Sequence, residues 1–192
     1  MEIKVGVSNR HVHLKKEDLE ILFGKNYELT KLKDLSQKGQ FASVETVTIK
    51  TLKNQIDNVR VLGPIRSYTQ IEISKTDSYV LGLNPPVRES GDIKDTPGIT
   101  LIGPNGSIDL KEGVIIPERH IHLTNADLIK YNLDKNKTVK IKVNGEKNTI
   151  LDSVSLKVDD SYTFELHLDT DDANACLINQ NDIVEIINDW KI

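Results

Sequence analysis

Cysteine is almost absent from this chain. Its one thiol, Cys176, has no second cysteine with which to form an intramolecular disulfide, so a reducing compartment is the expected home of the protein. The thiol lies among Ala173, Ala175, Leu177 and Ile178. This spacing is typical of the apolar face of a helix, and we predict that Cys176 packs in the core.

Aromatic residues and long apolar runs are also scarce. Phe, Trp and Tyr make up 5% of the 192 residues, so the core must consist mainly of Val, Ile and Leu. No apolar run approaches the length that a membrane-spanning helix needs. The formal net charge of −4 argues against nucleic acid or an anionic membrane as the main partner, but it leaves room for a local basic pocket that binds an anionic substrate.

The chain shows a strand-like pattern from its first residues. Ile3, Val5 and Val7 alternate with polar or small residues, as in a half-buried strand. This pattern leaves no room for a signal or targeting segment ahead of it. We therefore expect a cytoplasmic protein.

Histidine is rare but strongly clustered. The chain has five histidines, and four of them lie in two similar pentapeptides, Arg10-His11-Val12-His13-Leu14 and Arg119-His120-Ile121-His122-Leu123. The offset between the copies is 120 − 11 = 109 residues. On an extended segment, side chains alternate with period two, so both rings of a His-x-His pair point to the same side and can bind one metal ion. The repeat predicts two metal-binding half-sites, one in each half of the chain.

The rest of the pattern is mostly β. Helices are expected after each repeat, one ending at Gly24 and one beginning near Thr124, which has an acidic residue three positions on. Many short strands with few helices favour barrels or a sandwich over a doubly wound sheet, and two closely joined β-barrels fit the repeat. We expect strands at 41–50, 58–62, 69–73, 79–83, 139–143, 149–154, 163–168 and 183–187, a strand–turn–strand at 99–108 and an irregular, Pro-rich crossing at 84–91.

The remaining histidine, His167, ends a predicted strand and would give His120 and His122 a third nitrogen ligand. Three protein ligands leave zinc an open position for substrate. The first pair needs another ligand, and the residues alone select Glu72 only weakly. Copper, nickel or ferrous iron are alternatives to zinc, and ordinary core or surface histidines are the alternative to any metal. With Cys176 as the one thiol, a catalytic or substrate-binding role is favoured over a closed structural site.

Arg66 is the candidate anion-binding residue, because a guanidinium forms a fork that suits phosphate or carboxylate. A surface salt bridge is the alternative reading of Arg66. Arg10 and Arg119, which directly precede the histidine pairs, could serve as structural anchors.

Four blocks of the sequence together resemble one known family. They are the run from Val7 to Leu14, the run from Leu62 to Glu72, the second histidine repeat, and the run from His167 to Ala175. In this order and over nearly the whole chain, they resemble the PduL-type phosphate acyltransferases, also called phosphate propanoyltransferases.

The resemblance implies two β-barrels capped by short helices and an active site with two zinc ions. One barrel would combine residues 1–9 with 118–192, and the other would span 10–117. One zinc would be held by His11, His13 and Glu72 and the other by His120, His122 and His167, while Arg66 would bind the phosphate. The positions that match the coenzyme A pocket are Ser8, Lys33, Arg60, Leu62 and Asn174. A homodimer is also implied.

The implied reaction is reversible transfer of a short acyl group, acetyl or propanoyl, between coenzyme A and inorganic phosphate. Some members of the family carry an N-terminal extension that directs them into a microcompartment. This chain begins at the first predicted strand, so we expect no such targeting and a role in acetate metabolism. Two alternatives remain from the residues themselves: a di-metal hydrolase of phosphate or acyl esters, and a non-enzymatic, metal-stabilised binding module.

Overall fold

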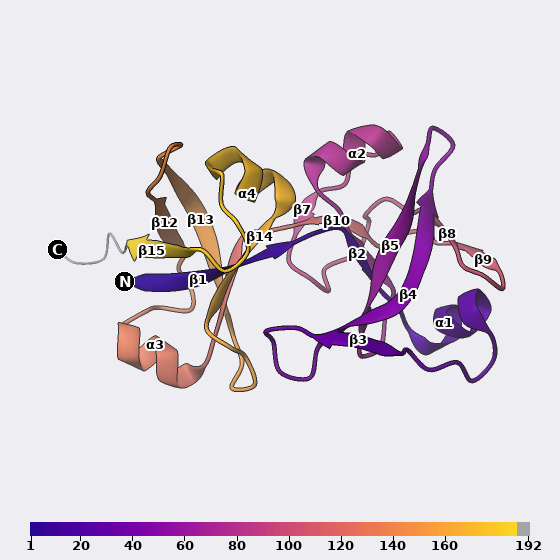
Figure 1. The fold of residues 1–192 in the computed structure, drawn as a ribbon, viewed down its shortest axis with the longest axis horizontal. Coiled ribbons are helices and arrows are strands. Elements are labelled where there is room, and N and C mark those ends of the chain that lie inside the picture. Colours follow the sequence, from indigo (N-terminus) through magenta and orange to yellow (C-terminus); the bar gives the residue numbers. More distant parts are fainter. Residues whose placement is uncertain (188–192) are drawn as a thin grey trace. The chain divides into compact units, whose positions relative to one another are not determined.

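The computed structural model describes residues 1–187, and it confirms a mainly β fold with short helices (Figure 1). The chain divides into two compact units. The first contains Met1–Ser8, Ser36–Lys38 and the chain from Glu118 onward, and the second contains Asn9–Leu35 and Gly39–Pro117. No helix in the described part of the chain is long and apolar enough to cross a membrane.

The first unit is a closed six-stranded barrel. Around the barrel the strand order is β1, β14, β11, β13, β12 and β15, and β15 pairs with β1 to close it. Along most of its strands the apolar side chains alternate inward, as period-two geometry requires. The strands are β1 (Glu2–Ser8), β11 (His120–Leu123), β12 (Val139–Val143), β13 (Thr149–Val158), β14 (Glu165–Asp169) and β15 (Ile183–Ile187).

The core of the barrel consists of aliphatic side chains, as the shortage of aromatic residues predicts. Val5, Ile121, Ile141, Val154 and Leu166 are fully buried in it. Two helices belong to this unit, α3 (Asn125–Tyr131) and α4 (Thr170–Cys176). The predicted cap at Thr124 is confirmed, because its hydroxyl accepts the N–H of Asp127 and the Asp127 carboxylate accepts the N–H of Thr124.

The second unit is a nine-stranded sheet that forms a half-barrel. The order is β7, β10, β6, β2, β5, β4, β8 and β9, and β3 pairs additionally with β4. The strands are β2 (His11–His13), β3 (Lys31–Asp34), β4 (Phe41–Lys50), β5 (Gln55–Gly63), β6 (Gln70–Glu72), β7 (Val87–Arg88), β8 (Thr100–Ile102), β9 (Ser107–Asp109) and β10 (Val114–Pro117). Helix α1 (Lys16–Phe23) buries Leu19 and Leu22 in the core of this unit.

One predicted strand of the second unit is wrong. Residues 79–83 were expected to be extended, but the chain forms helix α2 (Lys75–Leu81) there. The Ser74 hydroxyl accepts the Asp77 N–H at 3.2 Å, and the Asp77 carboxylate accepts the Ser74 N–H at 3.3 Å. This capping box starts a helix in spite of the β propensity of Tyr79 and Val80. Gly82, with φ of 67°, ends the helix in the left-handed conformation.

The histidine repeat is part of a larger repeated arrangement. In each unit the histidine strand lies between a parallel neighbour, β5 or β13, and an antiparallel neighbour, β6 or β14. A short helix, α2 or α4, follows the antiparallel neighbour, and the offset between the helix caps Ser74 and Asp169 is 169 − 74 = 95 residues. The sequence repeat therefore marks two copies of one supersecondary unit.

In both copies, the arginine that precedes the histidines anchors that helix. Arg10 donates from Nε and Nη2 to the two carboxylate oxygens of Asp77, at 2.9 and 2.8 Å. Arg119 donates from Nε to Asp172 at 2.9 Å. Both aspartates occupy the third helical position. The hydrogen bonds to Asp77 raise the pKa of Arg10 above its usual value, against the opposing effect of burial. The expectation that Arg10 and Arg119 are structural anchors is met by this geometry.

We predict that Asp77→Asn destabilises the protein more than Asp172→Asn. The Asp77 side chain is 4% exposed and accepts two hydrogen bonds from Arg10 and one from the Ser74 N–H. The Asp172 side chain is 20% exposed and accepts one from Arg119, so the replacement at Asp77 weakens more hydrogen bonds at a more buried position. The expected decreases in unfolding free energy in urea are roughly 2 and 1 kcal/mol. Asp34→Asn, at an exposed surface pair, is the matched control and should change it by less than about 0.5 kcal/mol. Equal effects of Asp77→Asn and Asp34→Asn would contradict the anchoring role.

Candidate functional site

The second unit brings His11, His13 and Glu72 together. One ligand atom from each lies within 4.8 Å of the others, and all three residues are buried. Strand β2 supplies both histidines on one face, and β6 places Glu72 directly opposite His11 in antiparallel register. The structure thus groups the three residues that the resemblance assigns to one metal.

The His11 ring is oriented for metal binding. Its Nδ1 lies 2.9 Å from the carbonyl oxygen of Asn9, so Nδ1–H is the donor to that carbonyl. The lone pair is then on Nε2, which lies 3.4 Å from Oε2 of Glu72. A backbone carbonyl that fixes the tautomer of a ligating histidine is common in metal sites.

His13 has an unsatisfied atom that a metal would satisfy. Its ring is 3% exposed, and among the described residues its Nδ1 has no hydrogen-bond partner. Burial, followed by the charges of His11 and Arg66, lowers the pKa of His13 well below its usual value, although the Leu62 backbone opposes this. The ring is therefore neutral near pH 7, and neutral imidazole is the form that binds metal ions.

The Glu72 carboxylate accepts a hydrogen bond from Gln70, two residues earlier on the same strand. The Gln70 Oε1 accepts the N–H of Gly91 at 2.7 Å, which fixes the orientation of the amide. Its Nε2 then donates to Oε1 of Glu72 at 2.7 Å and to the Ser90 hydroxyl at 2.9 Å. The other carboxylate oxygen, Oε2, lies 3.4 Å from Nε2 of His11, so one oxygen of Glu72 accepts from Gln70 and the other lies beside a predicted metal ligand.

The first unit brings His120, His122 and His167 together in the same way. His120 lies directly opposite His167 on the neighbouring strand, and the ring centroids of the three histidines are 4.5 to 5.1 Å apart. The His120 Nδ1 lies 2.8 Å from the Glu118 carbonyl oxygen, as His11 does with Asn9. Burial, and then the charge of Lys157, lowers the pKa of His120 well below its usual value. Its ring is therefore also neutral.

The polar side chains of Glu165, Ser36 and Gln37 lie beside His167. Oε2 of Glu165 lies 3.1 Å from His167 Nε2 and accepts a hydrogen bond from the Ser36 hydroxyl. Gln37 contacts the same ring nitrogen at 3.3 Å. Burial raises the pKa of Glu165, but the hydrogen bonds from His167, Ser36 and Gln37 outweigh it and hold that pKa below its usual value. Glu165 is thus a carboxylate near neutral pH.

Arg66 lies in the second unit, on the chain that follows β5. Its N–H donates to the carbonyl of Leu14 at 2.9 Å, which ties it to the end of the first histidine repeat. Its Nη1 donates to the Ser90 and Tyr68 hydroxyls at 3.1 and 3.3 Å. Ser90 also accepts from Gln70, so a chain of hydrogen bonds links Arg66 to Glu72. Ser90 and Tyr68 thus hold the guanidinium with hydroxyl groups, which do not neutralise its charge.

The five residues expected near coenzyme A lie in both units. In the second unit, Lys33 on β3 and Leu62 on β5 are both opposite Ala42 of β4, and Arg60 lies two residues from Leu62 on the same strand. In the first unit, Ser8 pairs with Asp169, the residue that caps α4, and Asn174 lies within α4. Each unit therefore groups its own members of the set.

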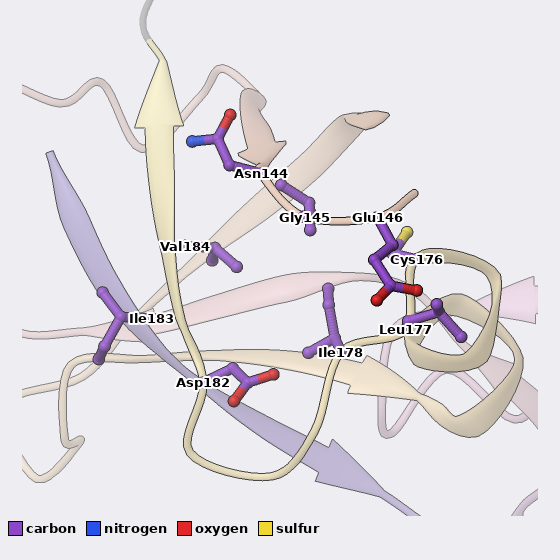
Figure 2. A pocket seen from close by; sticks show the side chains of 10 residues that line it. Asn144, Gly145, Glu146, Cys176, Leu177, Ile178, Asp182, Ile183 and Val184 are labelled. Carbon is purple, nitrogen blue, oxygen red and sulfur yellow. The ribbon is translucent and has the colours of Figure 1, made fainter. Parts of the chain in front are cut away.

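Cys176 is buried, at the end of α4, as predicted. It lines a pocket that also includes Ile178, Val184 and the carboxylates of Glu146 and Asp182 (Figure 2). Burial, and then the charge of Asp172, raises the pKa of the thiol, so it is not an activated nucleophile. Two carboxylates at the pocket disfavour a phosphate-bearing ligand there.

Sequence reasoning missed Gln70, Ser90, Glu165, Ser36 and Gln37. Gln70 and Glu165 could have been found, because each lies two residues before a predicted ligand and therefore on the same face of the strand. Ser90 lies within the Pro-rich crossing at 84–91, and Ser36 and Gln37 lie between β3 and β4. No local pattern marks those three positions.

Each histidine set should bind one divalent metal ion independently. We predict that His13→Gln lowers the zinc bound by the purified protein from two ions to one, because it removes a ligand from the first set only. His122→Gln is the matched variant in the other unit and should give the same decrease. Inductively coupled plasma mass spectrometry after gel filtration measures the ratio. Retention of two ions by His13→Gln would show that this set is not a metal site.

The sequence relatives of this chain point in one direction. Residues 4–179 match the model of the phosphate propanoyltransferase family. A protein of Thermotoga maritima named phosphate propanoyltransferase is 53% identical over 96% of this chain and 89% of its own length. Proteins with the same name from Priestia megaterium and Lachnoclostridium phytofermentans are 54% and 49% identical, over 94% and 96% of this chain and 83% and 87% of their own. This chain belongs to the phosphate propanoyltransferase family, whose members are acyltransferases.

Proposed function

We propose that this protein is a phosphate acyltransferase that moves a short acyl group, acetyl or propanoyl, between coenzyme A and inorganic phosphate with the help of two zinc ions. The observation that carries the proposal is the pair of three-ligand sets, one buried and one partly buried. The buried set is linked to Arg66 through Ser90 and Gln70. The relatives named phosphate propanoyltransferase supply the substrate class.

The ligand chemistry favours zinc over other metals. The two sets offer five imidazoles and one carboxylate, and such borderline ligands suit zinc. Three protein ligands in each set leave a position for a substrate atom, as in catalytic zinc sites. When bound, the metals would act as Lewis acids toward substrate oxygens that gain charge during acyl transfer.

The residues around the ligands would bind and orient the substrates. Arg66 would bind phosphate or the phosphoryl group of an acyl phosphate, with its guanidinium held in place by Ser90 and Tyr68. Lys33 and Arg60 are cations suited to the phosphate groups of coenzyme A, and Ser8, Leu62 and Asn174 are proposed to line the rest of that pocket.

Acyl transfer would occur in one step between the two bound substrates. The sulfur of the coenzyme A thiol attacks the acyl carbon, and the bond from that carbon to the phosphate oxygen breaks with its electron pair on the departing phosphate. The proton lost by the thiol is taken up by that phosphate, which leaves as hydrogen phosphate. The reverse reaction begins with attack of phosphate on the thioester. An acyl-enzyme is not required, since Cys176 is buried with a raised pKa and the five histidines are all assigned to metal binding.

The direct test is the absorbance of the thioester bond in acetyl-CoA and propanoyl-CoA mixed with phosphate. We expect phosphate-dependent loss of thioester, no loss after chelation, and recovery when zinc is restored. Thioester loss without phosphate would favour the hydrolase instead. Full activity after chelation would contradict the role of the metals.

Arg66→Gln should mainly weaken phosphate binding, because an amide keeps some hydrogen bonding but loses the charge and the two-pronged geometry. We predict that kcat/KM for phosphate decreases roughly 100-fold, with a much smaller change in KM for acetyl-CoA. Steady-state kinetics with each substrate varied in turn measures both. Lys111→Gln, which removes one charge at an exposed position of the same unit, is the matched control. Equal losses for both substrates would argue against a phosphate-specific role.

A further inference from the structure

Each histidine set is part of a group of four residues on one face of two paired strands. In the second unit, His11 is opposite Glu72 and His13 is opposite Gln70. In the first unit, His120 is opposite His167 and His122 is opposite Glu165. Directly opposed residues share a face, as do residues two apart on one strand. The two groups of four therefore correspond position by position.

The correspondence pairs Gln70 with Glu165 and Glu72 with His167. The offsets are 165 − 70 = 95 and 167 − 72 = 95, the same as for the helix caps that follow. Each group of four thus contains one carboxylate, but the carboxylate occupies a different corner in each. In the second unit it is the predicted ligand, and in the first unit it is the neighbour of the predicted ligand.

The different position of the carboxylate in each group of four gives each predicted ligand a neighbour of complementary hydrogen-bonding character. Where the predicted ligand is a carboxylate, Glu72, its neighbour Gln70 donates an N–H to it at 2.7 Å. Where the predicted ligand is an imidazole, His167, its neighbour Glu165 lies 3.1 Å from a ring nitrogen and can accept its proton. A carboxylate that holds a ligating histidine fixes the ring and makes it a better ligand.

The surroundings are shaped to keep the Glu165 carboxylate at this position. Glu165 is 2% exposed, and it accepts a hydrogen bond from Ser36. Gly6 lies directly opposite His167 on β1, and a Cβ there would come within 3.1 Å of the Glu165 carboxylate. Because Gly6 has no side chain, it leaves space for the Glu165 carboxylate. The protein thus accommodates a buried charge at a position where burial of an apolar side chain would cost less free energy.

We propose that Glu165 is a positioning residue for the metal site formed by His120, His122 and His167: it holds His167 and supplies the one negative charge of that site, as Glu72 does for the other. The inference rests on the proposed metal-dependent function. It adds a residue outside both ligand sets whose loss should affect one metal ion and not the other.

Zinc titration of the metal-free protein against a chromogenic chelator tests this proposal. In Glu165→Gln we expect one of the two ions to bind about 10–100-fold more weakly and the other to bind as in the wild type. Glu72→Gln should weaken the other ion, and Glu72→Gln combined with Glu165→Gln should weaken both. If both zinc affinities decrease in the double variant and one decreases in each single variant, the two carboxylates serve different metal sites.

Ser36→Ala separates this role from a structural one, because it removes a hydrogen bond to Glu165 and leaves the charge in place. If Glu165 only anchors the residues around Ser36, Glu165→Gln and Ser36→Ala will both lower the unfolding temperature of the metal-free protein. Both zinc affinities will then be unchanged in each variant, and this result would overturn the proposal. A wild-type protein that binds no zinc would overturn the metal-dependent function itself. Two normal zinc affinities in Glu165→Gln would overturn only the role of Glu165.

Discussion

The register between each histidine strand and its antiparallel neighbour is the constraint on which the rest of the structure depends. A shift of one residue would turn every side chain of the strand to the opposite face. The intervening residues prevent such a shift, because Val12 and Leu14 in one unit and Ile121 and Leu123 in the other are fully buried. The hydrophobic core thus aligns His11 with Glu72 and His120 with His167, although the core residues are not themselves predicted metal ligands.

Burial also determines the charge state of two of the histidines, one in each set. Removal from water disfavours charged imidazole, and the pKa values of His13 and His120 are lowered by it. The carboxylates in the same surroundings accept hydrogen bonds, Glu72 from Gln70 and Glu165 from Ser36. Neutral nitrogen lone pairs beside one supported carboxylate are a favourable environment for a divalent cation.

The parts of the site that could be predicted from the sequence are those that depend on local geometry. The His-x-His pairs follow from strand alternation alone, and the cap at Thr124 follows from its neighbour three residues on. Residue chemistry selected His167 because it was the last histidine, whereas Glu72 needed the family resemblance. Gln70 and Glu165 depend on cross-strand register, and Ser36 and Gln37 reach Glu165 and His167 across a sequence separation of more than 100 residues. Residues 79–83 were predicted wrongly because the capping box before them outweighed local β propensity.

We propose that the repeat builds two metal sites with unequal ligands. Diffraction from crystals of the zinc-loaded protein, with data collected on either side of the zinc absorption edge, tests it most directly. We expect two anomalous peaks, one bounded by His11, His13 and Glu72 and the other by His120, His122 and His167. A zinc-loaded crystal with no peak at either set, or with its zinc bound at other residues, would contradict it.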